Sequence, residues 1–228
     1  MAKVKKDTAD FSEEIKIKVL LWSYRHCCLC GKQCGTKIEV HHIVPKSKGG
    51  TGDPDNAIPL CFDCHAEVAA YQCEHPTGTK FSKKELKARR EQIYEEHTRH
   101  LVPPLDYKIT QQLPFGNKKR IFPDVGLTVV NLSDYLKARV FFRLNVILNN
   151  GKSEVIEDDY YNGTKPWHMN PRLIASGHFD IPQWARQRGE RLEIRTLCTI
   201  SDIHEREHEL LPVGWVYMWD KNKWYFEP

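Results

Sequence analysis

The spacing of hydrophobic positions changes near the middle of the 228-residue chain. Between positions 11 and 22, apolar residues recur at near-helical spacing, and Ser12 lies near the start of this stretch. The pattern predicts an N-terminal helix capped by that serine. The stretch SKKELKARREQIYEEHTRHL begins at Ser82 and predicts a further helix with the same kind of cap. Between them we expect cysteine-rich loops, a strand that carries histidines, and a helix from about Cys61.

From Leu127 onward, β-branched and aromatic residues alternate with polar ones in short runs such as LTVVNL, ARVFFRLNVILN and RLEIRTLCTI. The sequence DKNK between two aromatic runs is typical of a hairpin turn. This half is predicted to be an antiparallel β-sandwich of about 100 residues with immunoglobulin-like architecture. The chain is therefore expected to be an α+β protein.

The stretch 102–126 contains four prolines and two glycines and has no sustained periodicity, which predicts a linker. The expected organisation is an N-terminal domain at 1–101, the linker at 102–126 and the β-sandwich domain at 127–228.

Composition agrees with a soluble globular protein, with 40% hydrophobic and 28% charged residues. No apolar run approaches the roughly 20 residues of a membrane span, and the basic N-terminus leads into no signal-like apolar segment. We therefore expect a cytoplasmic protein. The net charge of +4 is compatible with a polyanionic partner but does not by itself indicate one.

Seven of the eight cysteines fall within the first 73 residues, and they include two Cys-x-x-Cys pairs. In a reducing compartment such pairs are more typical of metal ligands than of disulfides. Cys27 and Cys30 with Cys61 and Cys64 predict a tetrahedral four-thiolate zinc site. Because four thiolates leave no open position, this zinc is expected to be structural. A neighbouring cysteine, Cys28 or Cys34, is an alternative ligand.

The stretch VHHIVPKSKGGTGDPDNAIPLCFDCH contains adjacent histidines, His41 and His42, and a third at His65. Adjacent side chains on a strand point to opposite faces, so His41 and His42 are expected to have different roles. One would face a metal ion and the other a water molecule, and His65 could complete the metal site. Asn56 lies in the connecting loop, where its amide could fix the backbone.

This order of a histidine pair, an asparagine and a histidine between cysteine pairs resembles the HNH endonuclease (ββα-metal) family, in its zinc-knuckle branch. The resemblance covers about residues 25–90. It implies that His41 and His65 bind a divalent ion, that His42 is the general base, and that Asn56 orients the loop. The implied ion is Mg²⁺ or Mn²⁺, with Ni²⁺ or Zn²⁺ as alternatives, and water and phosphate would complete its coordination.

The resemblance implies a metal-dependent endonuclease that hydrolyses DNA, with RNA as the alternative substrate. Basic side chains beside the histidines could hold flanking phosphates; these are Lys46, Lys48, Lys83, Lys84, Lys87 and Arg90. The C-terminal domain would then be a sensing or targeting module of a bacterial restriction or anti-phage effector, through a sensor ligand or a homo-oligomer contact. The competing interpretation is a zinc-binding nucleic-acid adaptor without catalysis.

HEREH, from His204 to His208, fits the H-E-x-x-H pattern of zinc metalloproteases. That pattern places both imidazoles on the same side only when the stretch forms a helix. Here it lies between two strand-like runs, which predicts a polar strand connection rather than a protease site.

Overall fold

A computed structural model describes residues 10–70, 81–110, 122–157 and 165–227 of the chain. The chain divides into two compact units, Met1–His100 and Leu101–Pro228, and each is described by itself. No helix in the described ranges is both long and apolar enough to cross a membrane.

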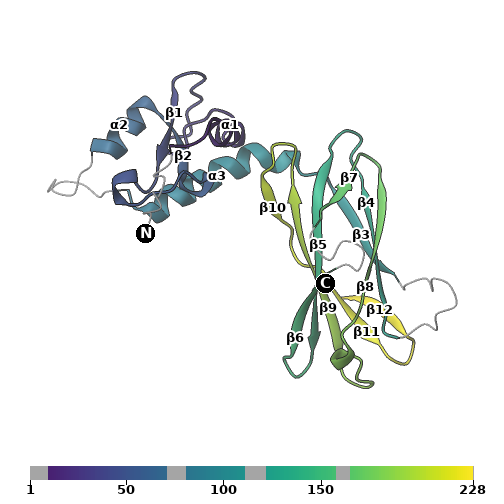
Figure 1. Cartoon of the computed structure of the whole chain (residues 1–228). Helices are drawn as coiled ribbons and strands as arrows, with labels where there is room; N and C mark the ends of the chain where they lie inside the picture. Colours follow the sequence, from purple (N-terminus) through teal and green to yellow (C-terminus); the bar gives the residue numbers. More distant parts are fainter. Residues whose placement is uncertain (1–9, 71–80, 111–121, 158–164, 228) are drawn as a thin grey trace, which may run out of the picture. The chain divides into compact units, whose positions relative to one another are not determined.

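The N-terminal unit combines three α-helices with a two-stranded sheet (Figure 1). Its elements are α1 (Glu13–Trp22), β1 (Ile38–His42), short 3-10 helices at Lys46–Lys48 and Pro54–Asn56, β2 (Ala57–Cys61), α2 (Phe62–Ala70) and α3 (Lys83–Thr98). Both predicted caps are confirmed. The Ser12 hydroxyl accepts from the N–H of Ile15 at 3.2 Å, and the Ser82 hydroxyl accepts from the N–H of Glu85 at 3.1 Å.

The antiparallel hairpin of β1 and β2 leads directly into α2. His41 lies opposite Ile58 and His42 opposite Ala57 in the hairpin register. Every residue of β2 is buried, so this strand anchors the hairpin in the core of the unit. The histidine-bearing strand β1 lies at the surface of that core, because all its residues keep some exposure.

The C-terminal unit is rich in antiparallel sheet, as predicted. A 3-10 helix at Arg99–Leu101 crosses the boundary between the units. The elements that follow it are β3 (Leu105–Thr110), β4 (Val125–Asn131), β5 (Ala138–Leu148), β6 (Ser153–Glu157), β7 (Trp167–Met169), β8 (Ile174–Phe179), a 3-10 helix at Gln183–Ala185, β9 (Leu192–Ser201), β10 (Glu207–Glu209), β11 (Gly214–Met218) and β12 (Lys223–Glu227).

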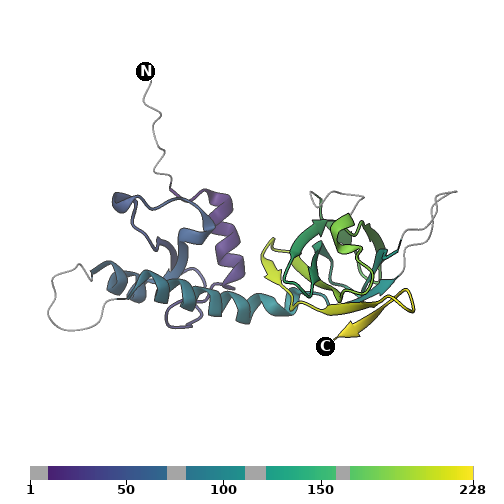
Figure 2. The same cartoon turned by 90° about the horizontal axis from the view of Figure 1, so that it is seen from below.

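Two sheets make up this unit. One has the order β12-β11-β9-β5-β6, with β10 added to β9 and β7 added to β5, and the other has the order β3-β4-β8. Figure 2 shows the strands around a common interior. Along β5 every second residue is buried, as expected for a strand with one face on a core. The core is continuous across both sheets and includes Trp167 and Trp215.

Part of the predicted linker is a strand, which corrects the prediction for 102–126. β3 pairs with β4 from Leu105 opposite Asn131 to Thr110 opposite Gly126. Its burial alternates, with Leu105, Tyr107 and Ile109 packed against the core of the C-terminal unit. The prolines flank this strand instead of interrupting it, so it can pair normally.

Candidate functional site

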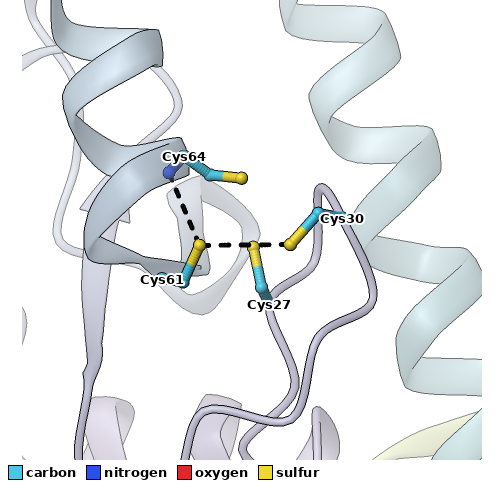
Figure 3. A group of neighbouring side chains, drawn as sticks. All are labelled: Cys27, Cys30, Cys61 and Cys64. Carbon is cyan, nitrogen blue, oxygen red and sulfur yellow. Dashed lines mark hydrogen bonds between the residues drawn. The ribbon is translucent and has the colours of Figure 1, made fainter.

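Four cysteine side chains converge in the N-terminal unit (Figure 3). The Sγ atoms of Cys27, Cys30, Cys61 and Cys64 all lie within 4.8 Å of one another. The first pair lies in the loop after α1, Cys61 ends β2, and Cys64 lies in the first turn of α2. This set of four sulfur donors fits a tetrahedral zinc ion, and it is the set predicted from the sequence. Such an ion would join the loop, the hairpin and the helix.

The alternative ligands Cys28 and Cys34 lie outside the cluster. Cys28 is buried, its N–H donates to the carbonyl of Pro59 at 2.9 Å, and burial raises the pKa of its thiol well above the ordinary value. The Cys34 thiol donates to the carbonyl of Lys32 at 3.0 Å.

The thiols of the cluster differ in acidity. Burial raises the pKa of Cys27, but backbone N–H groups around Cys30, Cys61 and Leu29 donate to its sulfur and bring its pKa below the ordinary value. Burial raises the pKa of Cys64 strongly, and the hydrogen bond between the side chains of Cys64 and Cys61 raises it further. Four thiolates this close together would repel one another. A bound zinc ion would offset that repulsion, because zinc binds sulfur in its deprotonated form.

His41 and His65 come together from different elements. Their ring centroids are 4.7 Å apart and the rings are nearly perpendicular. Burial, then the neighbouring His65 and His42, lower the pKa of His41, while the charge of Glu39 acts in the opposite sense. A lowered pKa keeps the imidazole neutral near pH 7, the form that binds metal ions. The two predicted metal ligands therefore lie where one ion could reach both.

His42 has different surroundings from His41, as the alternation of side chains along a strand requires. Its ring stacks on Phe11 with centroids 3.9 Å apart and an interplanar angle of 22°. The Nε2 atom is buried, although the residue as a whole keeps partial exposure. Phe11, which the sequence predicted only as a helix residue, thus holds the predicted general base in place.

Asn56 fixes the loop between the two strands. Its amide oxygen accepts from the N–H of Val44 at 2.7 Å, and its amide nitrogen donates to the carbonyls of Val44 and Thr51 at 3.1 and 2.8 Å. Gly50 lies against the same residues, since a Cβ atom there would come within 1.8 Å of the Val44 carbonyl oxygen. These bonds tie the Asn56 side chain to the backbone of the loop that follows His42.

The five lysines predicted to contact phosphate fall into two groups. Lys48, Lys83 and Lys84 are exposed. Lys46 and Lys87 are partly buried and form ion pairs with Asp10 and Asp55, so each has an acidic neighbour.

Arg90 differs from its predicted role. It is only 5% exposed, and its guanidinium donates to the carbonyls of Pro54, Asp55 and Ala57 at 3.2, 2.7 and 3.2 Å. It also pairs with Glu91 at 2.7 Å. A guanidinium enclosed in this way stabilises the Asn56 loop and is not placed to hold DNA.

Glu39 was not among the residues predicted from the sequence. Its Oε2 atom lies 3.6 Å from Nε2 of His65, and both side chains keep contact with solvent. The signal that could have identified it is the spacing Glu-x-His, because residues two apart on a strand share a face.

The HEREH stretch is not helical, so its two imidazoles are not placed as the metalloprotease pattern requires. Glu207–Glu209 is strand β10, and His208 is buried with its Nε2 atom 2.9 Å from Asp202. The first three residues of the stretch thus lie in the connection between β9 and β10, as predicted, but its last two lie in β10 itself, where His208 is buried.

Known proteins are similar to parts of this chain. A family model described as HNH endonuclease matches residues 27–69. The chain is 36% identical over 61 residues to the type IV methyl-directed restriction enzyme EcoKMcrA of Escherichia coli K12, which is 24% of this chain and 22% of that protein. It is 36% identical over 67 residues to anaredoxin of Nostoc sp. PCC 7120, which is 29% of this chain and 68% of that protein.

The chain thus spans about a fifth of the restriction enzyme and about two thirds of anaredoxin. The chain is also similar to a solved structure titled "X-ray structure of Northeast Structural Genomics Consortium target SoR45". The matched region covers 49% of this chain and 82% of the chain in that structure. Its 12% identity and TM-score of 0.26 are too low to define a shared fold.

Proposed function

Since this chain carries an HNH endonuclease domain at residues 27–69 and so belongs to that family, we propose that it is a metal-dependent endonuclease that hydrolyses DNA. The observation that carries the proposal is the meeting of His41 and His65, with ring centroids 4.7 Å apart, beside a loop fixed by Asn56. A zinc-stabilised scaffold alone would not require two histidines from different elements to face each other at the surface.

The residues would divide the chemistry of phosphodiester hydrolysis. His41 and His65 would hold a divalent ion, which when bound supplies positive charge to the phosphate and the departing oxygen. His42 would take the proton from the attacking water. Its buried Nε2 leaves Nδ1 as the nitrogen for this step, and the Phe11 ring keeps the imidazole oriented. Lys48, Lys83 and Lys84 would contact flanking phosphates in any sequence.

The proposed nuclease would bind metal ions at two different sites. The cysteine cluster would hold a structural Zn²⁺, because sulfur donors suit that ion. The histidine site would use Mg²⁺ or Mn²⁺, with Ni²⁺ or Zn²⁺ as alternatives. Its few protein ligands leave positions for water and a phosphate oxygen, as catalysis requires.

We further propose that the C-terminal unit, as an immunoglobulin-like sandwich, recruits or triggers the nuclease in restriction or anti-phage defence in the cytoplasm. The similarity to a methyl-directed restriction enzyme supports this role and suggests modified DNA as a substrate. A sensor ligand or a second copy of the chain would be its partner.

The test is cleavage of supercoiled plasmid, with and without cytosine methylation, in Mg²⁺, Mn²⁺ or Ni²⁺, with an RNA substrate in parallel. We expect metal-dependent nicking by the full chain and a fall of about 10²–10⁴-fold in His42→Ala. His100→Ala, a substitution of an exposed histidine of the same unit, is the matched control and should cleave like the wild type.

The adaptor interpretation gives the opposite result. A folded, zinc-loaded wild type that binds DNA but leaves both plasmids and RNA intact with every metal would contradict the nuclease proposal. Equal cleavage by wild type and His42→Ala would remove the assigned role of that histidine.

A further inference from the structure

We propose that Glu39 is a third protein ligand of the divalent ion, so that Glu39, His41 and His65 form a two-histidine, one-carboxylate site. The inference rests on the proposed function of this site and adds a residue to it. The family resemblance implies only two histidines, with water and phosphate, around this ion.

Strand geometry places Glu39 beside His41. Both lie on β1, two residues apart, and side chains with that spacing project from the same face of a strand. His42, between His41 and the loop, projects to the other face and packs on Phe11. Because β1 pairs in regular register with β2, no bulge disturbs this alternation.

His65 brings the third donor from α2 to this face of β1. Its ring is 4.7 Å from that of His41, and its Nε2 atom is 3.6 Å from Oε2 of Glu39. His65 therefore lies beside both Glu39 and His41, where β1 and the first turns of α2 come together. Among the described residues only the four cysteine sulfurs form a set of donors that all lie within 4.8 Å of one another, so Glu39 would join an ion held by the two histidines by a turn of its exposed side chain. Glu39 keeps 54% of its side-chain surface exposed and His65 keeps 33%, so an ion and a phosphate could both enter.

The Glu39–His65 distance suits a shared ion better than a direct bond. At 3.6 Å the two atoms are farther apart than hydrogen-bonded atoms. With metal–ligand bonds of about 2.1 Å, two ligands are about 3.0 Å apart at a right angle and about 3.4 Å apart at the tetrahedral angle. An ion would draw these two atoms slightly closer together, and a turn of the Glu39 side chain would direct its carboxylate toward His41 as well.

The donor set also matches the expected ion better with Glu39 than without it. Imidazole alone favours zinc, copper or nickel, whereas Mg²⁺ and Mn²⁺ prefer oxygen donors. A carboxylate supplies that oxygen and a negative charge against the cation. Three protein ligands still leave open positions for the attacking water and the phosphate, as in catalytic sites with two histidines and a glutamate.

The alternative is a surface ion pair between Glu39 and a protonated His65. Such a pair contributes little to stability. If Glu39 only formed this pair, its removal would weaken metal binding no more than the removal of any other nearby negative charge. The two interpretations therefore differ in what the removal of one carboxylate does to metal binding.

The experiment is Mn²⁺ binding to the full, zinc-loaded chain, measured by calorimetry and by the loss of the electron paramagnetic resonance signal of aqueous Mn²⁺. Glu39→Gln keeps the size of the side chain and removes its charge. Glu67→Gln is the matched control, because Glu67 is exposed on α2 two residues beyond His65, a spacing at which helical side chains do not face each other. His65→Ala identifies the site.

We expect one Mn²⁺ per chain at a site that His65→Ala abolishes, a dissociation constant at least tenfold weaker in Glu39→Gln, and a change of less than twofold in Glu67→Gln. Glu39→Asp, which keeps the charge on a shorter stem, should fall between wild type and Glu39→Gln. Equal affinity of Glu39→Gln and wild type would overturn the inference, as would the absence of a Mn²⁺ site that depends on His65.

Failure of this inference and failure of the proposed function can be told apart. Weakened Mn²⁺ binding in Glu39→Gln together with an inert wild type on every nucleic acid would leave the ligand set standing and remove the nuclease. Cleavage that requires His42, with unchanged Mn²⁺ binding in Glu39→Gln, would leave the nuclease standing and remove Glu39 from the metal.

Discussion

Arg90 illustrates how one side chain can link two parts of the candidate site. It lies on α3, but its guanidinium donates to carbonyls of Pro54, Asp55 and Ala57 on both sides of Asn56. Asn56 in turn fixes the loop after His42 through Val44 and Thr51. The helix and the histidine-bearing hairpin are therefore connected by hydrogen bonds as well as by packing.

We expect Arg90→Lys to destabilise the N-terminal unit by about 2 kcal/mol, because an ammonium group cannot reproduce the forked pattern of bonds and leaves buried carbonyl groups unsatisfied. Chemical denaturation followed by the far-ultraviolet helix signal measures this loss. DNA binding by the folded fraction should change little, since the side chain is enclosed.

Lys83→Ala and Lys84→Ala provide the contrast on the same helix. Both lysines are exposed in the first turn of α3, so their loss should leave the free energy of unfolding nearly unchanged. The double variant should bind DNA more weakly and show a shallower dependence of affinity on salt. If Arg90→Lys behaved like these variants, the assignment of Arg90 to the loop would be wrong.

The sequence could not distinguish these cations, because they share one charged helix. What separates Arg90 from Lys83 is the loop it meets after folding, about 35 residues earlier in the chain. The cysteine cluster was predictable because its paired spacing reflects coordination chemistry. Glu39 and the stacking of Phe11 on His42 depend on which face of β1 meets which neighbour.

Among the elements, the capped helices and the longer strands with clear alternation were predicted, whereas β3 was not. The caps of α1 and α3 are local, because Ser12 and Ser82 bond an N–H three residues away. β3 carries only a short signal, the alternation of Leu105, Tyr107 and Ile109 with polar residues, and the prolines around it favoured a linker; its hydrogen bonds go to β4. Strand pairing of this kind is decided by burial against a core that a short window of sequence does not contain.

The turn between β9 and β10 contains a buried carboxylate that makes the stability of the C-terminal unit depend on pH. Asp202 accepts from the N–H groups of His204 and Arg206 at 2.7 and 3.1 Å and lies 2.9 Å from Nε2 of His208. Burial raises the pKa of Asp202, but these donors, with His208 first among them, lower it by more, so the net pKa lies below the ordinary value.

Because the folded-state pKa lies below the unfolded value of about 3.9, Asp202 contributes stability that is complete above that pH and is lost as the pH falls through the folded pKa. Asp202→Asn should destabilise the unit by about 2 kcal/mol at pH 7 and by progressively less in acid. Denaturation followed by tryptophan fluorescence between pH 3 and 7 measures this.

Asp134→Asn is the control for that measurement. Asp134 is an exposed carboxylate paired with Arg172, so its loss should have only a small effect at any pH. If Asp202→Asn and Asp134→Asn gave the same pH profile, the buried turn would not be the source of the acid sensitivity.

In the molecule as a whole, the two units depend on different stabilising features. The N-terminal unit contains all three α-helices of the described residues and relies on a cysteine cluster that joins loop, hairpin and helix. The C-terminal unit has a core of two sheets and five of the six tryptophans. Removal of zinc should therefore affect one unit and spare the other.

We expect a strong chelator to abolish most of the helix signal while the tryptophan fluorescence of the C-terminal unit and its thermal transition persist. Binding of structural zinc contributes roughly 10–16 kcal/mol in small zinc domains, more than a unit of this size retains without it. Cys61→Ser should reproduce the effect of the chelator. Cys34→Ser should not, because Cys34 lies outside the cluster and a serine hydroxyl can also donate to Lys32. Simultaneous loss of both transitions on chelation would mean that the C-terminal core depends on the zinc-bound unit, against the division into two separate cores.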